Sequence, residues 1–131
     1  MDAEFYQDLA FTLTGGFWLT LKIIVPSSII GLVIGVLVGA VRGTGYPRIL
    51  VAPLNAYVSL FRGTALFVQL FICYYGLPDL AMLIKPFFVA HNLPPVWKVF
   101  YMSPYTASVV TFSLCSGAYH SEYIRGAILS I

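Results

Sequence analysis

Charged residues are scarce in this sequence. Only 9% of its 131 residues are Asp, Glu, Lys or Arg, whereas 60% are hydrophobic, and the mean hydropathy is +0.89. Soluble domains usually carry about a quarter charged residues. A chain so poor in charge cannot cover itself with polar surface, which indicates a membrane as its solvent. The formal net charge of +2 is too small to suggest a nucleic-acid-binding surface.

The sequence also lacks the residue patterns of an enzyme. It contains no glycine-rich phosphate loop, nucleophile elbow or pair of carboxylates suited to acid–base catalysis. Cys73 and Cys115 lie in apolar stretches without metal-ligand or disulfide spacing, so packing roles are expected. His91 has no second ligand, and His120 with Glu122 does not complete a metal site. We therefore expect no catalytic residue, no metal and no cofactor in this chain.

Long apolar runs predict an all-α protein that crosses the membrane several times. A spanning helix needs about 20 apolar residues, so the chain accommodates about three spans with their loops. The predicted spans are residues 17–41, 49–77 and 105–124, within one transmembrane domain of residues 1–131. We expect residues 1–16 to form either a short interfacial segment or a frayed terminus.

Residues 78–104 contain most of the prolines and predict a loop, in which residues 80–90 could form a short interfacial helix. Pro26 lies one turn inside the first span and removes a backbone donor. We expect the hydroxyl of Ser27 or Ser28 to bond the carbonyl that this proline leaves free.

The first span carries a row of glycines at helical spacing. Gly31, Gly35 and Gly39 recur every four residues, and Gly43 continues the row. Such a stripe lets another helix backbone approach closely. A single pair would mean little in a membrane helix, but a row in register predicts a helix-packing face.

Arg62, Gly63 and Thr64 interrupt the second span. Discontinuous membrane helices can place polar groups and helix ends at a transport path. Alternatively, the helix is continuous and tilted, and Arg62 snorkels to the headgroups. Arg62 and Thr64 are candidates for lining a path. The same applies to Gln69, which lies deeper and suits an interhelical hydrogen bond.

Tyr119 and Glu122 share a face of the third span with Thr111, Cys115 and Ala118. If this face lines a path, Tyr119 and Glu122 could contact a zwitterionic or cationic solute. The alternative is ordinary helix packing, with Glu122 merely paired to Arg125 on the next turn near the headgroups.

Two stretches resemble signatures of bacterial ABC importer permeases for polar amino acids, of the histidine, glutamine or arginine type. They are AYVSLFRGTALFVQLFICYYGLP, from Ala56 to Pro78, and GAYHSEYIRGAILSI, from Gly117 to Ile131. Weaker resemblance covers Gly15–Lys22 and Gly31–Arg42. The residues that match the second family motif are Gly117, Ala118, Tyr119, Glu122, Arg125 and Gly126. Ala65 stands where the family usually has a proline, and the chain stops at Ile131, before the coupling loop of the family.

The resemblance implies part of a type I ABC importer permease fold. It implies a multi-pass chain of the cytoplasmic (inner) membrane that pairs with a second permease subunit as a homo- or heterodimer. Cytosolic ATPase subunits would carry ATP and Mg²⁺, and an external solute-binding protein would deliver a polar amino acid. The short, arginine-containing segment 42–48 favours the cytoplasm, which places the N-terminus outside. The alternative is a non-transporting scaffold, or an inactive truncated permease, that oligomerises through the glycine row.

Overall fold

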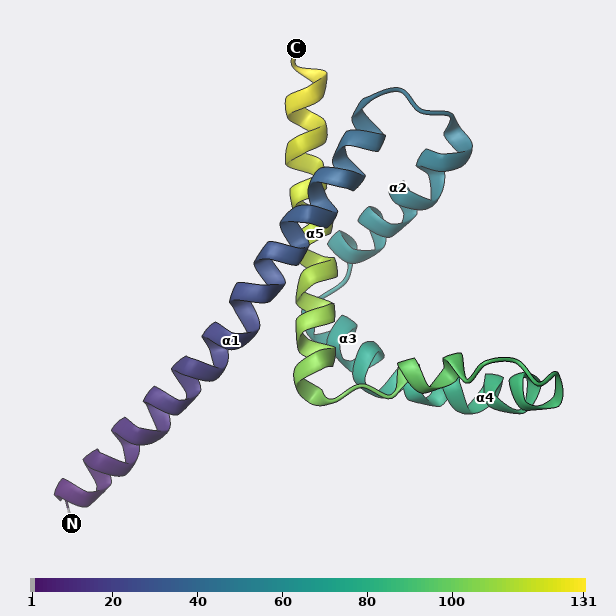
Figure 1. Cartoon of the computed structure of the whole chain (residues 1–131). Helices are drawn as coiled ribbons and strands as arrows, with labels where there is room; N and C mark the ends of the chain where they lie inside the picture. Colours follow the sequence, from purple (N-terminus) through teal and green to yellow (C-terminus); the bar gives the residue numbers. More distant parts are fainter. Residues whose placement is uncertain (1) are drawn as a thin grey trace.

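The computed structural model describes the backbone of residues 2–131 and the side chains of residues 4–131. Every regular element in this part of the chain is helical, which confirms the all-α prediction. The elements in chain order are α1 (Asp2–Gly43), α2 (Arg48–Gly63), α3 (Leu66–Phe71), the π-helix η1 (Ile72–Gly76), α4 (Leu77–Ala90), the 3₁₀-helix η2 (Val96–Phe100) and α5 (Pro104–Leu129). Figure 1 shows α1 and α5 crossing, with α2 on one side of α5 and α4 extending away from it.

The surface of the protein is largely apolar. In the described residues the buried hydrophobic side chains are few and mostly small, namely Val58, Ala81, Ala107 and Ala118, while large apolar side chains point outward along every helix. Two helical segments, Glu4–Gly43 and Leu66–Ala90, are long and apolar enough to cross a membrane. Lipid is the solvent that such a surface requires.

Helix α1 is longer than one membrane span. It runs unbroken over 42 residues, or about 63 Å at 1.5 Å per residue, against about 30 Å of hydrocarbon. The frayed terminus considered for residues 1–16 is wrong from Asp2 onward, because the helix continues through Gly15 and Gly16, and the interfacial position of this segment stays a prediction. Helix α1 also continues past Pro26.

The carbonyl that Pro26 leaves without a helical donor belongs to Lys22. Tyr105 Oη, at the start of α5, donates to this oxygen at 2.8 Å. The prediction that a neighbouring serine would do so is wrong, since Ser27 Oγ donates to the Ile23 carbonyl instead, at 2.6 Å. The proline thus creates a contact between helices.

The pair formed by α1 and α5 is the most extensive helix contact in the chain. Along it the glycine row of α1 (Gly31, Gly35, Gly39 and Gly43) faces a row of α5 that also advances by four, consisting of Ser116, His120, Ile124 and Ile128. A Cβ on Gly31 would lie 2.7 Å from Ser116 Cβ, and one on Gly39 would lie 2.8 Å from Ile124 Cβ. Any larger side chain would push the helices apart.

Helix α5 begins with a capping serine followed by a proline. Ser103 Oγ accepts a hydrogen bond from the Thr106 backbone at 3.2 Å, and Pro104 occupies the first turn, where no donor is needed. The helix is polar for a membrane segment, but its buried hydroxyls are satisfied. Thr111 Oγ1, for example, donates to the Ala107 carbonyl at 2.7 Å.

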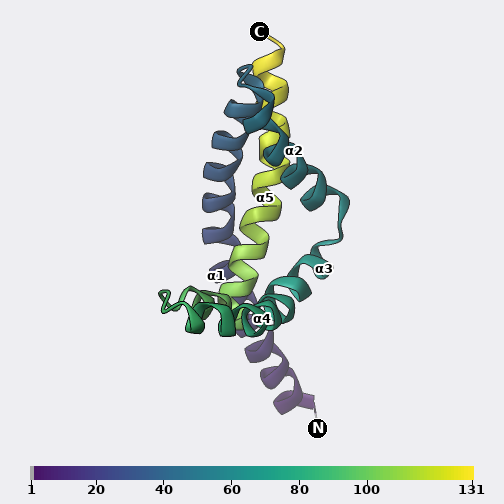
Figure 2. The ribbon, with the colours of Figure 1, turned by 90° about the vertical axis from the view of Figure 1, so that its right-hand side faces the viewer.

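The segment predicted as the second span contains a break. Helix α2 ends at Gly63, Ala65 is extended, and α3 starts at Leu66. Beyond α3 and η1, the chain turns into α4, which Figures 1 and 2 show running across the axis of α5. The short helix considered for residues 80–90 is confirmed as part of α4, but the loop predicted from residue 78 is wrong at its start, because Pro78 lies in the first turn of α4 and the helix also accommodates Pro86.

Candidate functional site

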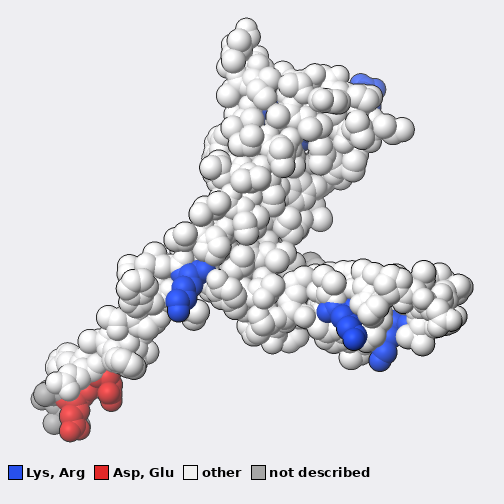
Figure 3. Space-filling view, in the orientation of Figure 1, with Lys and Arg blue, Asp and Glu red and all other residues white. Residues whose placement is uncertain are grey.

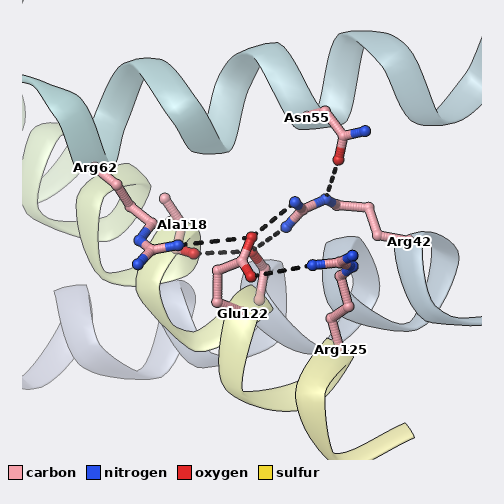
Figure 4. A network of polar contacts seen from close by, with 7 residues as sticks. Arg42, Asn55, Arg62, Ala118, Glu122 and Arg125 are labelled. Atoms are coloured by element: carbon pink, nitrogen blue, oxygen red, sulfur yellow. Dashed lines mark hydrogen bonds and ion pairs between the residues drawn. The ribbon is translucent and has the colours of Figure 1, made fainter. Parts of the chain in front are cut away.

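Four charged side chains meet where α1, α2 and α5 approach one another (Figure 4). Glu122 of α5 lies 2.7 Å from Arg42 of α1, 3.7 Å from Arg62 of α2 and 3.4 Å from Arg125 of its own helix. We call these four residues the arginine cluster. It contains three guanidinium groups and one carboxylate, so it carries surplus positive charge.

Arg42 is the structural member of the arginine cluster. Its side chain is only 6% exposed. Its Nε donates to Asn55 Oδ1 of α2 at 2.6 Å, and its Nη1 donates to Ser121 Oγ of α5 at 3.3 Å. With Nη2 on Glu122, each nitrogen of the guanidinium has a partner. Arg42 thereby joins three helices, which offsets the cost of burying its charge.

Arg62 and Arg125 are the accessible members. Their side chains are 45% and 41% exposed, and their distances to Glu122 are those of loose ion pairs rather than short hydrogen bonds. The guanidinium of Arg62 lies 5.6 Å from the ring centre of Tyr119, within the range of a cation–π contact. These two arginines have donors left for an anionic group of a ligand.

Gln69 and Thr64 form a separate group at the break between α2 and α3. Gln69 is 6% exposed, and its Nε2 donates to Thr64 Oγ1 at 2.7 Å and to the carbonyls of Phe61 and Thr64 at 2.8 and 3.1 Å. These bonds occupy carbonyls that the end of α2 would leave free. Gln69 was predicted to form a hydrogen bond to a neighbouring helix. Its hydrogen bonds instead join α3 to the end of α2, the two parts of the broken segment. Gln69 Oε1 is buried without a partner.

A small cavity adjoins this break. Its volume is about 110 Å³, and its lining residues are Leu60, Phe61, Thr64, Gln69, Ile72 and Cys73. Apart from Gln69 and Thr64 the lining is apolar. No group of three metal-ligating side chains occurs among the residues described.

The five residues predicted to line a path thus fall into two places. Arg62, Tyr119 and Glu122 lie together, whereas Thr64 and Gln69 hold the helix break. Sequence reasoning missed the role of Arg42, which was considered as part of the arginine-containing segment 42–48, and missed its partner Asn55. In the sequence, Arg42 and Asn55 each stand out only as a polar residue close to the end of an apolar segment. That pattern does not show which residue each of them contacts.

The fold and the polar cluster define a helical membrane protein in which four charged side chains are gathered between helices. Several curated permeases resemble its sequence. The chain is 39% identical to the arginine transport system permease protein ArtQ of Bacillus subtilis (strain 168), over 88% of this chain and 45% of the relative. It is 35% identical to the L-cystine transport system permease protein TcyB of the same organism, over 91% and 43%.

The putative glutamine transport system permease protein GlnP of Rickettsia prowazekii (strain Madrid E) is 35% identical, over 98% of this chain and 50% of the relative. No family model and no solved structure matches the chain. The chain is thus similar over most of its length to amino-acid ABC transporter permeases, the resemblance that its motifs indicated. It spans about half the length of the curated relatives it matches.

Proposed function

We propose that the chain is part of a permease subunit that carries a polar amino acid across the membrane in an ATP-driven importer. Support comes from relatives named for arginine, L-cystine and glutamine transport. In this proposal α1, α2 and α5 form part of the translocation path. ATP is hydrolysed on separate cytosolic subunits, a second permease subunit completes the path, and an external binding protein delivers the solute.

The observation that carries the proposal is the pairing of opposite charges beside an aromatic face. Arg62 and Arg125 offer donors suited to a carboxylate, Glu122 offers an acceptor suited to an ammonium group, and Tyr119 presents its ring beside Arg62. A free amino acid has both a carboxylate and an ammonium group. Charges of this kind within membrane segments are costly and usually serve a pathway.

In this proposal the protein lies in the cytoplasmic (inner) membrane with its N-terminus outside. The segment that joins α1 to α2 is short and is flanked by Arg42 and Arg48, and such short basic segments stay in the cytoplasm. The arginine cluster then lies toward the cytoplasmic end of the path. A solute would meet it late in its passage.

Transport in vesicles tests the proposal. The longer protein that contains this chain would be reconstituted with its ATPase and binding protein, and ATP-dependent uptake of labelled arginine, cystine and glutamine would be measured. We expect uptake of at least one of them, and Glu122→Gln should abolish it while the complex still assembles. Asp79→Asn removes a carboxylate outside the cluster and should leave uptake unchanged. Normal uptake by the assembled Glu122→Gln protein would overturn the assignment of Glu122.

A scaffold that oligomerises through the glycine row has less support. Gly31, Gly35 and Gly39 already face α5 of the same chain, with no room for another side chain at Gly31 or Gly39. A second copy would have to displace α5 to use this face. We therefore keep transport as the single proposed function.

A further inference from the structure

Two lysines converge on one indole ring, far along the chain from the arginine cluster. Lys85 Nζ of α4 lies 5.1 Å from the ring centre of Trp97, and Lys98 Nζ of η2 lies 5.8 Å from it. Each contact is a cation–π interaction. Two ammonium groups held near the same ring also repel one another, so an anion between them would stabilise the arrangement.

The residues that the structure describes supply no such anion at that place. The ion pairs within the described residues all involve Glu122. Asp79 is the one acidic residue of α4, and it lies six positions before Lys85. Side chains on a helix lie next to each other when they are three or four positions apart, not six. No ion pair joins Asp79 to either lysine. The part of the chain that the structure describes thus leaves the two lysines without a counter-charge, and an anionic group of another molecule can supply it.

The lysines lie at the level where α1 would leave the hydrocarbon. The uncharged residues 23–41 of α1 measure about 28 Å as a helix, close to the thickness of a bilayer core. Lys22 ends this run on one side. Its backbone carbonyl accepts a hydrogen bond from Tyr105 Oη at 2.8 Å. That bond fixes the start of α5 beside Lys22. Figure 3 shows the basic side chains of α4 and η2 at about the height of the basic patch low on α1.

The side chains around the lysines are apolar and exposed, which suits a lipid better than a hydrated ion. Helix α4 runs across the axis of α5 (Figure 2), and its outward side chains are large and apolar, with Leu83 76% exposed. Phe87 and Val89 are also exposed on this helix. A phospholipid can make both kinds of contact: its phosphate would bind the ammonium groups, and its acyl chains would cover the apolar side chains.

We propose that Lys85, Trp97 and Lys98 form a headgroup site for an anionic phospholipid. Both ammonium groups bind the phosphate, the indole ring lies at the level of the glycerol, and the acyl chains contact the exposed apolar side chains of α4. The site is separate from the arginine cluster and does not depend on the proposed transport function.

Quenching of tryptophan fluorescence tests this site directly. These 131 residues contain two tryptophans, so Trp18→Phe leaves Trp97 as their only tryptophan, and any tryptophan elsewhere in a longer protein is replaced as well. The protein would be placed in phosphatidylcholine vesicles that contain phosphatidylglycerol, with bromine on the acyl chains of one lipid or the other. We expect brominated phosphatidylglycerol to quench Trp97 as if it were enriched roughly thirtyfold at the site, given two lysines near the surface.

The double variant Lys85→Gln/Lys98→Gln should lose this preference while brominated phosphatidylcholine still quenches, which shows that Trp97 remains in the membrane. Lys22→Gln is the matched control, because it removes a lysine from the same level that does not contact Trp97, and it should keep the preference. Equal quenching by the two lipids in the parent protein would overturn the proposal, as would a preference that survives in the double variant.

Discussion

Arg42 and Glu122 form the shortest ion pair of the arginine cluster, with 2.7 Å between Arg42 Nη2 and Glu122 Oε1. The pair joins the end of α1 to α5, and Asn55 extends it to α2 through Arg42 Nε. One buried side chain thus sets the relative positions of three helices. Arg62 and Arg125 contact the same carboxylate from its more exposed side.

This division predicts different consequences for two arginine substitutions. Arg42→Gln should destabilise the protein by about 3 kcal/mol, because a buried member of an ion pair is lost and Asn55 loses its donor. Arg125→Gln should cost less than about 1 kcal/mol, because its ion pair with Glu122 is long and partly exposed. Thermal unfolding in detergent, followed by circular dichroism, measures both. Equal losses for the two variants would contradict the assignment of Arg42 as the structural member.

The features of the fold that follow from local sequence were accessible before the structure. The spacing of Gly31, Gly35 and Gly39 identified the face of α1 that contacts α5, because helical periodicity alone puts them on one face. The sequence Arg62-Gly63-Thr64 marked a possible break, and α2 ends there. Gly63 disfavours the helix, and its neighbours are polar.

Features that depend on tertiary contacts were not accessible. Asn55 and Arg42 are 13 residues apart, and Ser121 is 79 residues from Arg42, so only the packing of three helices brings them together. The length of α4 was missed for a different reason. A high proline content predicts a loop, but what matters is where each proline falls, and Pro78 occupies a first turn that tolerates it.

The glycine row leads to a second prediction. A Cβ on Gly39 would lie 2.8 Å from the Ser121 carbonyl oxygen, a backbone atom that cannot move aside alone, so Gly39→Val should separate α1 from α5. Gly16→Val is the matched control on the same helix, because no atom lies within 4 Å of the added group. Crosslinking of paired cysteines placed at Gly43 and Ile128, whose Cβ atoms would lie 3.1 Å apart, reports the helix separation in a protein that lacks Cys73 and Cys115. We expect efficient crosslinking with Gly16→Val and a severalfold loss with Gly39→Val. Unchanged crosslinking in the Gly39 variant would refute a tight contact.

Gln69 leads to a third prediction, about the break itself. Its amide group bonds Thr64 and the Phe61 carbonyl, so Gln69→Met, similar in size but without the donor, leaves buried carbonyls unsatisfied at a cost of about 1–3 kcal/mol. Because the lost bonds are local, backbone amide hydrogen exchange should accelerate in peptides that cover residues 60–69 and stay unchanged in α1. Phe67→Leu alters an exposed side chain of the same short helix and should leave the exchange rates unchanged. Acceleration spread evenly over all helices would show that Gln69 supports the whole fold and not the break.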